Sequence, residues 1–363
     1  YEGYWIDSVE VNGTKYPLQP DWIEDQWGGP LDGRMAVIQT MPELGPVPMS
    51  AQPRDNLKNF YRTGATYTNT VAVSAGRENA NMRLSISNLS NKGIIPNNSL
   101  NRQTISLISG AKITDRLYVE AKASYIHEAN KNRPVIGSDF LNINRNFTRI
   151  ARHINLDWLK NYKNPDGGMT NWVNNGAIMN PYWVLNETGG DDQRDRLIGY
   201  ISLQYKFTDW LNFRARAAHD GYTDVRNEFI GKGTLAGYNE GAVKSFQYKV
   251  SELNTDAILT ASGKLSKKLN GSLLLGGNLY KTSTTITGFE GSNLNYDNLY
   301  HISNAKIVSP TNYLGRKEVQ SAFFSGELAY NNYLFLNITG RNDWSSALGQ
   351  LSFFYPSVSI SNV

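Results

Sequence analysis

The chain has 363 residues, of which 40% are hydrophobic, 12% are aromatic and none is cysteine. The net charge of +4 is slight and the basic residues are scattered among acids, which argues against a nucleic-acid partner. The lack of cysteine excludes disulfides and thiolate metal sites, and no apolar run approaches the length of a membrane-spanning helix.

Alternation of apolar and polar residues predicts strands with one apolar and one polar face. In "RLIGYISLQYKF", for example, Ile201 and Leu203 lie on one face, and Ser202 and Gln204 on the other. The region from Trp5 to Val11 is expected to hold the end of a further strand. The eleven strands predicted in this way span residues 63–76, 82–90, 101–114, 116–128, 193–207, 210–222, 250–265, 270–284, 318–330, 333–343 and 353–363.

The connections between these strands alternate in length. Tight turns are expected at 113–116, 207–210, 266–270 and 330–333. Long polar connections are expected at 129–192, 223–249 and 286–317, with a shorter one at 91–100. Short turns at one end, long loops at the other and strands of ~9–11 residues are typical of an outer-membrane β-barrel. A soluble β-sandwich or a β-solenoid also alternates, but a sandwich rarely needs loops of this length, and no fixed repeat is found.

Three stretches resemble the SusC/RagA-like TonB-dependent transporters of the outer membrane. They are "NFYRTGATYTNTVAVSAGRENANMRLSISNLSNKGIIPNNSLNR" at 59–102, "ITGRNDWSSALGQLSFFYPSVSIS" at 338–361 and, more weakly, "WGGPLDGR" at 27–34. The motif residues, to which we assign structural roles, are Asn59, Phe60, Tyr61, Gly64, Gly93, Pro96, Asn97, Arg341, Asn342, Asp343, Trp344 and Pro356.

The resemblance implies an all-β fold, namely the N-terminal half, about 11 strands, of a larger antiparallel transmembrane barrel. An open half-sheet would leave unpaired edges in lipid, so we expect a plug domain, a TonB-binding N-terminal region and a C-terminal barrel half outside this chain. The expected organisation of residues 1–363 is an early external loop region at 1–58, first strands at 59–128, a long external loop at 129–192, and further strands and loops at 193–363.

The resemblance also implies a function without covalent chemistry or cofactor. A SusD-like lipoprotein would cover the external opening and hand over a glycan or peptide, and TonB would supply the energy for import. A siderophore receptor without such a lipoprotein is the alternative in the same class. An outer-membrane barrel hydrolase and a soluble β-rich adhesion module are the alternatives in other classes.

Aromatic residues of the long loop are the candidate ligand contacts, because aromatic faces beside amide groups suit glycan or peptide recognition. The alternative is that these rings pack the loop on itself or on a partner. The four candidates are Trp158, Trp172, Tyr182 and Trp183.

Catalytic and metal sites are not expected. His219 and Asp220 are neighbours at a strand end, but consecutive strand residues point to opposite faces and cannot pair side by side. "NPDGG" at 164–168 and the Asp191–Asp192 pair have no calcium-loop spacing, and "PDGG" is first of all a turn.

The polar segment Arg341, Asn342, Asp343 and Trp344 is expected to close an external hairpin, with Pro356 marking the start of the next strand. We interpret it as a rigid loop that an Arg–Asp pair ties to its neighbours, rather than as a ligand site.

Overall fold

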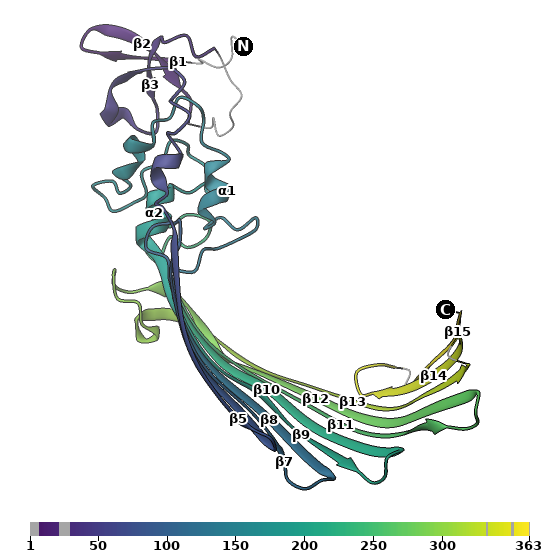
Figure 1. The fold of residues 1–363 in the computed structure, drawn as a ribbon. Helices are drawn as coiled ribbons and strands as arrows, with labels where there is room; N and C mark the ends of the chain where they lie inside the picture. The colour runs from purple at the N-terminus through teal and green to yellow at the C-terminus, as the bar shows by residue number, and fades with distance from the viewer. Residues whose placement is uncertain (1–6, 22–29, 332, 350–351, 363) are drawn as a thin grey trace.

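The computed structural model describes residues 7–21, 30–331, 333–349 and 352–362. Its main feature is an 11-stranded antiparallel sheet in which each strand pairs with its neighbours in sequence, from β5 to β15 (Figure 1). The strands are β5 (Ala65–Arg77), β6 (Ala80–Lys92), β7 (Ser99–Lys112), β8 (Leu117–Lys131), β9 (Thr188–Lys206), β10 (Leu211–Ile230), β11 (Ala242–Lys264), β12 (Leu269–Leu294), β13 (Ala305–Tyr330), β14 (Leu334–Ser345) and β15 (Ser352–Asn362).

The eleven predicted strands and their order are confirmed, but four of them are much longer than the alternation indicated. Residues 223–249 and 286–317, which were expected to be long loops, are mostly continuations of β10 to β13. The connections that remain are 231–241 and 295–304. Both faces of these extensions carry polar residues, for example in "KTSTTIT" at 281–287, so the contrast between faces fades although β-branched threonine favours a strand.

The tight turns lie at one end of the sheet, which we call the turn end, and the longer connections lie at the other, the rim end. Thr114 Oγ1 accepts a hydrogen bond from the Leu117 amide at 3.0 Å, and Thr208 Oγ1 accepts one from the Leu211 amide at 3.1 Å. These side chains satisfy backbone groups that the strands leave free, as threonine commonly does in turns. The predicted tight turns are therefore confirmed.

The two faces of the sheet differ in chemistry. On one face, Leu197, Ile201 and Leu203 of β9 are 51%, 55% and 37% exposed, although they are large apolar side chains. No second sheet of the described residues covers this apolar face. A continuous apolar band of this size is unusual on a soluble monomer. The opposite, polar face carries alternate residues such as Gln204.

The predicted hairpin tip is wrong in position. Arg341, Asn342, Asp343 and Trp344 belong to β14, and Pro356 lies inside β15, opposite Gly340. The Arg–Asp pair does form: Arg341 Nε donates to Asp343 Oδ1 at 2.7 Å. Arg341 also donates to Ser321 Oγ on β13 at 2.8 Å, so the pair braces two strands rather than loops.

The rim end is uneven. Residues 305–318 of β13 pair with β12, whereas β14 pairs with β13 only from Val319 to Tyr330. Among the described residues, the first half of β13 therefore has a ladder partner on one side alone.

A separate small unit, the rim module, lies at the rim end beside the start of β5 (Figure 1). We define it as residues 7–21, 30–60 and 132–187. It contains a second sheet of β1 (Asp7–Val11), β2 (Thr14–Gln19), β3 (Met35–Ile38) and β4 (Pro46–Pro48). Strand β1 pairs with β2, so the expected barrel strand at Trp5 to Val11 is not formed by Asp7–Val11. Trp5 and Ile6 lie outside the described residues.

The long connection between β8 and β9 supplies the rest of the rim module. It carries α1 (Ile143–Phe147), α2 (Pro181–Glu187) and the short helical segment Leu156–Lys160. Their apolar side chains share one buried core with Ile38, Met41 and Phe60. No helix among the described residues has both the length and the apolar character that a membrane crossing requires.

Polar contacts also bind the two halves of the module together. Asn56 Nδ2 donates to the Ile154 carbonyl at 2.9 Å, and Gln52 Nε2 donates to the His153 carbonyl at 3.1 Å. The His153 ring is 2% exposed and its Nε2 contacts Gln19 Oε1. The long connection between β8 and β9 is thus ordered largely by contacts outside its own hairpin, as its length predicts.

A pair of substitutions tests the assigned faces. We expect Leu203→Arg to cost ~2–4 kcal/mol if the apolar face meets hydrocarbon. The adjacent Gln204→Arg lies at almost the same depth on the polar face and should cost well under half as much. Refolding of the full-length protein into lipid vesicles at increasing urea measures both costs. Equal costs would show that the faces are assigned wrongly.

The buried histidine predicts a pH dependence. Burial lowers the pKa of His153 from 6.5 to about 4, so on acidification the unfolded chain takes up the proton before the folded chain does. Stability of the rim module should therefore be lost as pH falls from 6.5 toward 4, by ~2 kcal/mol between pH 7 and pH 5.

Tryptophan fluorescence reports this loss, since Trp172 and Trp183 are buried in the module. The expected result is a lower urea midpoint at pH 5 than at pH 7, and a smaller difference in His153→Gln, whose amide can still reach Gln19. An unchanged pH dependence in His153→Gln would contradict the assignment.

Candidate functional site

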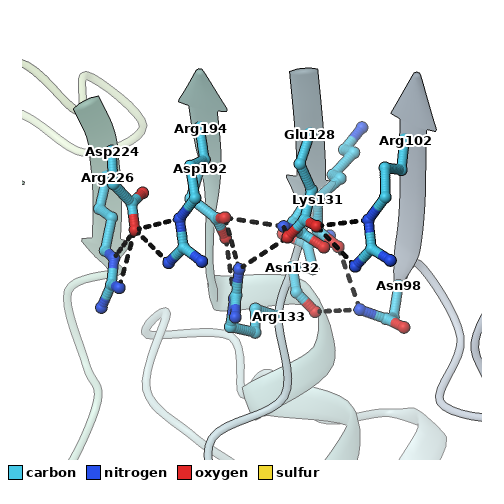
Figure 2. A network of polar contacts seen from close by, with 11 residues as sticks. Asn98, Arg102, Glu128, Lys131, Asn132, Arg133, Asp192, Arg194, Asp224 and Arg226 are labelled. Carbon is cyan, nitrogen blue, oxygen red and sulfur yellow. Dashed lines mark hydrogen bonds and ion pairs between the residues drawn. The ribbon is translucent and has the colours of Figure 1, made fainter. Parts of the chain in front are cut away.

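A row of charged side chains crosses the polar face of β7 to β10 near the rim end (Figure 2). We call it the ionic ladder; its members are Arg102, Glu128, Arg133, Asp192, Arg194, Asp224 and Arg226. Arg102 Nε donates to Glu128 Oε2 at 2.8 Å, and Arg133 Nη2 donates to Asp192 Oδ1 at 2.6 Å. Asp224 Oδ2 accepts from Arg194 Nη2 at 2.7 Å and from Arg226 Nη2 at 2.9 Å.

Strand register produces this ladder. Glu128 is opposite Arg102 on one side and opposite Arg194 on the other, and Arg194 is opposite Asp224. One step nearer the rim, Asp192 is opposite Arg226. Direct cross-strand neighbours of opposite charge stabilise a sheet. The sequence shows alternating charges in "DDQRDR" at 191–196, but it does not show which charges on the neighbouring strands face them. The ladder therefore becomes apparent only when the register is known.

The carboxylates of the ladder are withdrawn from solvent. Asp224 is 0% exposed and Asp192 is 6% exposed, whereas their arginine partners remain half-exposed. Asn130 Nδ2 joins Asp192 and Glu128 at 2.8 and 3.2 Å. Because Arg133 belongs to the β8–β9 connection, the ladder also anchors the rim module to the strands.

A cavity of about 650 Å³ lies beside the ladder, between residues 132–141 and the strands β9 to β11. Its apolar lining includes Val135, Ile136 and Phe140, of which Ile136 is 83% exposed. Its charged lining includes Asp192, Arg226, Glu228 and Lys244. A concave site with apolar walls and a few charged groups of both signs suits a ligand that has the same mixture.

The four predicted ligand aromatics lie elsewhere. Trp172 and Trp183 are 0% exposed inside the rim module, and Trp183 Nε1 donates to Thr234 Oγ1 at 2.9 Å. Trp158 and Tyr182 are partly buried against the same core. None of the four lines the cavity. Their burial supports the packing alternative; a ligand role for them stays a prediction that no comparison tests.

The motif residues near the start of β5 lie where the rim module joins the sheet. Phe60 is 4% exposed and meets Tyr182 and Phe147 edge-on, and Tyr61 Oη donates to Asn144 Oδ1 at 2.6 Å. Asn59 lies in the short helical segment Lys58–Phe60.

Glycines and one left-handed residue shape the join between β6 and β7. A Cβ on Gly64 would come within 3.1 Å of Ile94, and one on Gly93 would overlap the Asn98 side chain. Asn97, next to Pro96, has a φ of 65°, a left-handed conformation that asparagine tolerates better than most residues.

The candidate catalytic and metal residues are not brought together. His219 contacts Ser251 Oγ at 3.2 Å, whereas Asp220 pairs with Arg196 on the other face. Asp191 and Asp192 likewise point to opposite faces. Residues 164–168 form a turn closed by Gly167 N to Asn164 O at 2.9 Å. In the described part of the chain, no group of three or more His, Asp or Glu residues could hold a metal ion.

The ionic ladder predicts that the Asp192 carboxylate holds residues 132–141, which form one wall of the cavity, in place. Asp192→Asn should cost ~3–5 kcal/mol, because it leaves Arg133 and its neighbours without a buried counter-charge. Residues 132–141 should then exchange their amide hydrogens faster. Asp195→Asn is the matched control: it lies on the same strand but pairs with His127 at a half-exposed site, where ~0.2–1 kcal/mol is expected. Similar losses in both variants would contradict a special role for the ladder.

Comparison with known proteins gives one relative in sequence and several in structure. No family model matches the chain. "TonB-dependent receptor P3" of Formosa agariphila is 24% identical over 316 residues, which are 83% of this chain and 30% of that protein.

Two solved structures show the same fold. The RagAB peptide transporter matches with a TM-score of 0.67 at 16% identity, over 85% of this chain and 35% of the solved one. The ferripyoverdine receptor of Pseudomonas aeruginosa matches with a TM-score of 0.56 at 13% identity, over 83% and 39%.

The chain thus spans about a third of the length of the proteins that it matches. Their barrels lie in the outer membrane, which explains an apolar face that no second layer covers. The predicted resemblance to SusC/RagA-like proteins is confirmed, and the chain has the fold of an eleven-stranded part of the outer-membrane barrel of a TonB-dependent receptor.

Proposed function

We propose that this chain is part of a TonB-dependent transporter that imports an organic nutrient, and that the nutrient is a peptide rather than a neutral oligosaccharide. The cavity beside the ionic ladder carries this proposal. It offers aliphatic and aromatic wall residues together with Glu228, Lys244 and the ladder.

Peptides carry apolar side chains between charged groups, so they match a cavity with both kinds of lining. Lys244 Nζ lies 3.1 Å from Glu290 Oε1 and 5.6 Å from the centre of the Tyr238 ring, which keeps the ammonium at the cavity edge. A glycan site, by contrast, would use accessible aromatic faces for stacking. Trp172 and Trp183, the best such rings of the rim module, are buried.

The proposal includes a SusD-like surface lipoprotein over the rim end. The rim module presents exposed apolar side chains next to the cavity, including Val135 and Ile136, which are 39% and 83% exposed. Exposed apolar clusters of this kind mark protein contacts. The solved structure named as the RagAB peptide transporter shares the fold of this chain. TonB would act through a region of the protein outside residues 1–363.

A siderophore receptor is the second candidate, because the ferripyoverdine receptor shares the fold. The higher TM-score of RagAB and the mixed charge of the cavity favour the nutrient transporter. A hydrolase receives no support from the contacts of His219 and Asp220 described above.

Substitution of one wall residue in the full-length transporter tests the proposal. Ile136→Asp adds a charge at a highly exposed position, so folding should be unaffected. A bound peptide would bury the added charge without a partner, so peptide uptake should fall about tenfold or more. Tyr296→Asp is the control: Tyr296 is 70% exposed on the β12–β13 connection and does not line the cavity.

Cells that express each variant would be given labelled peptides, labelled malto-oligosaccharides or a ferric siderophore. Loss of peptide uptake in Ile136→Asp alone supports the proposal. If Ile136→Asp lost siderophore or oligosaccharide uptake and kept peptide uptake, the peptide proposal would be wrong and that other substrate would take its place. If the wild-type protein were purified without any lipoprotein, the proposal of a SusD-like partner would be wrong.

A further inference from the structure

The apolar face of β10 to β13 carries a cluster of cations at the rim-side boundary of its apolar band. We call it the boundary patch: Lys249, Lys281 and Arg316, with the hydroxyls of Ser251 and Ser283 between them. Ser283 is opposite Ser251 on β11 and opposite Arg316 on β13, and Lys281 is one step along the same face of β12. Diagonal neighbours in a sheet lie roughly 7–8 Å apart, so Lys281 and Arg316 can reach one anion.

The cations of the patch differ from those of the ionic ladder in their partners. Lys281 Nζ lies 3.0 Å from Glu318 Oε2, an ion pair that is open to solvent on both sides. Within the described residues, no acidic side chain pairs with Arg316 or Lys249. His219 is adjacent on β10 and contacts Ser251. The patch therefore offers the positive charges of Arg316 and Lys249, beside the Ser283 hydroxyl, on the side of the sheet that faces lipid.

Directly below the patch, toward the turn end, the apolar face is hollowed by a groove of about 780 Å³. Its floor is made of small residues on three neighbouring strands, Ala217, Ala257 and Gly277. Its sides include Leu279 and Trp344. Leu279 and Lys281 are two residues apart on one face of β12, so the groove and the patch are continuous.

We propose that the boundary patch and this groove together bind one phosphate-bearing lipid of the outer leaflet. The headgroup phosphate would accept hydrogen bonds from Arg316, Lys281 and Ser283, because charge-assisted bonds to phosphate are among the strongest in proteins. One acyl chain would lie over Ala257 and Gly277. Position argues for lipid rather than protein: the groove opens into the hydrocarbon region, and the patch lies where headgroups begin.

Two independent changes in the full-length protein test the proposal. The double substitution Lys281→Ala with Arg316→Ala removes the charge, and Ala257→Phe fills the groove without altering charge. The control, Lys92→Ala with Lys131→Ala, removes the same charge from the same face of β6 and β8, where both lysines are opposite Ser99 and away from the groove.

Native mass spectrometry of protein from nanodiscs would count retained phosphatidylglycerol and phosphatidylcholine. The wild type should prefer phosphatidylglycerol. The patch variant should lose roughly fivefold of this preference per cation, and so about 25-fold for the pair. Ala257→Phe should lower retention of both lipids, and the control should resemble the wild type. Heat-modifiable migration confirms that each barrel has assembled.

Three results would overturn the proposal. Equal preference in the patch variant and the wild type would mean that the cations do not meet the headgroup. An effect of the charge variant without one of Ala257→Phe would indicate a site for free anions rather than for a lipid. An equal effect of the control would show only general attraction of the basic rim.

Discussion

The backbone of this protein must satisfy its hydrogen bonds within the sheet, because hydrocarbon offers no partner for a free N–H or C=O group. Every strand from β6 to β14 therefore pairs on both sides with its neighbours in sequence, and tight turns suffice at one end. The same pairing fixes the side-chain period at two, so one face meets lipid and the other meets the lumen. Both the ionic ladder and the boundary patch follow from this arrangement, since each is a row of side chains on a single face.

The constraint also explains which features could be predicted from sequence. Within the membrane, lipid forces a strict contrast between faces, so Leu203 and Gln204 could be assigned correctly. Above the membrane both faces are wet and the contrast is lost, so the extensions of β10 to β13 were taken for loops. Arg341 to Trp344 were misplaced for a related reason: charged residues on the lumen face of β14 have the composition of a turn.

The rim module could not be predicted from the periodicity of apolar residues. Its helices have five and seven residues, too few for a helical stripe, and their core includes strands from more than a hundred residues earlier. One local signal was available: Asn180 before Pro181 is a helix start, and Asn180 does accept from the Tyr182 amide at 2.8 Å. The burial of Trp172 depends on packing between distant parts of the chain, and the ionic ladder depends on strand register. Neither can be predicted from composition.

The unequal lengths of β13 and β14 affect how the mouth of the barrel is bounded. β13 has 26 residues and β14 has 12, so β13 extends about 14 residues, roughly 48 Å along the strand, past its neighbour. The wall is thus high over β10 to β13 and drops abruptly at β14. Among the described residues, β13 therefore ends in a step, where residues 305–318 have no ladder partner on the side of β14. Lys306, Pro310 and Lys317 along the raised margin discourage another chain from adding a strand there.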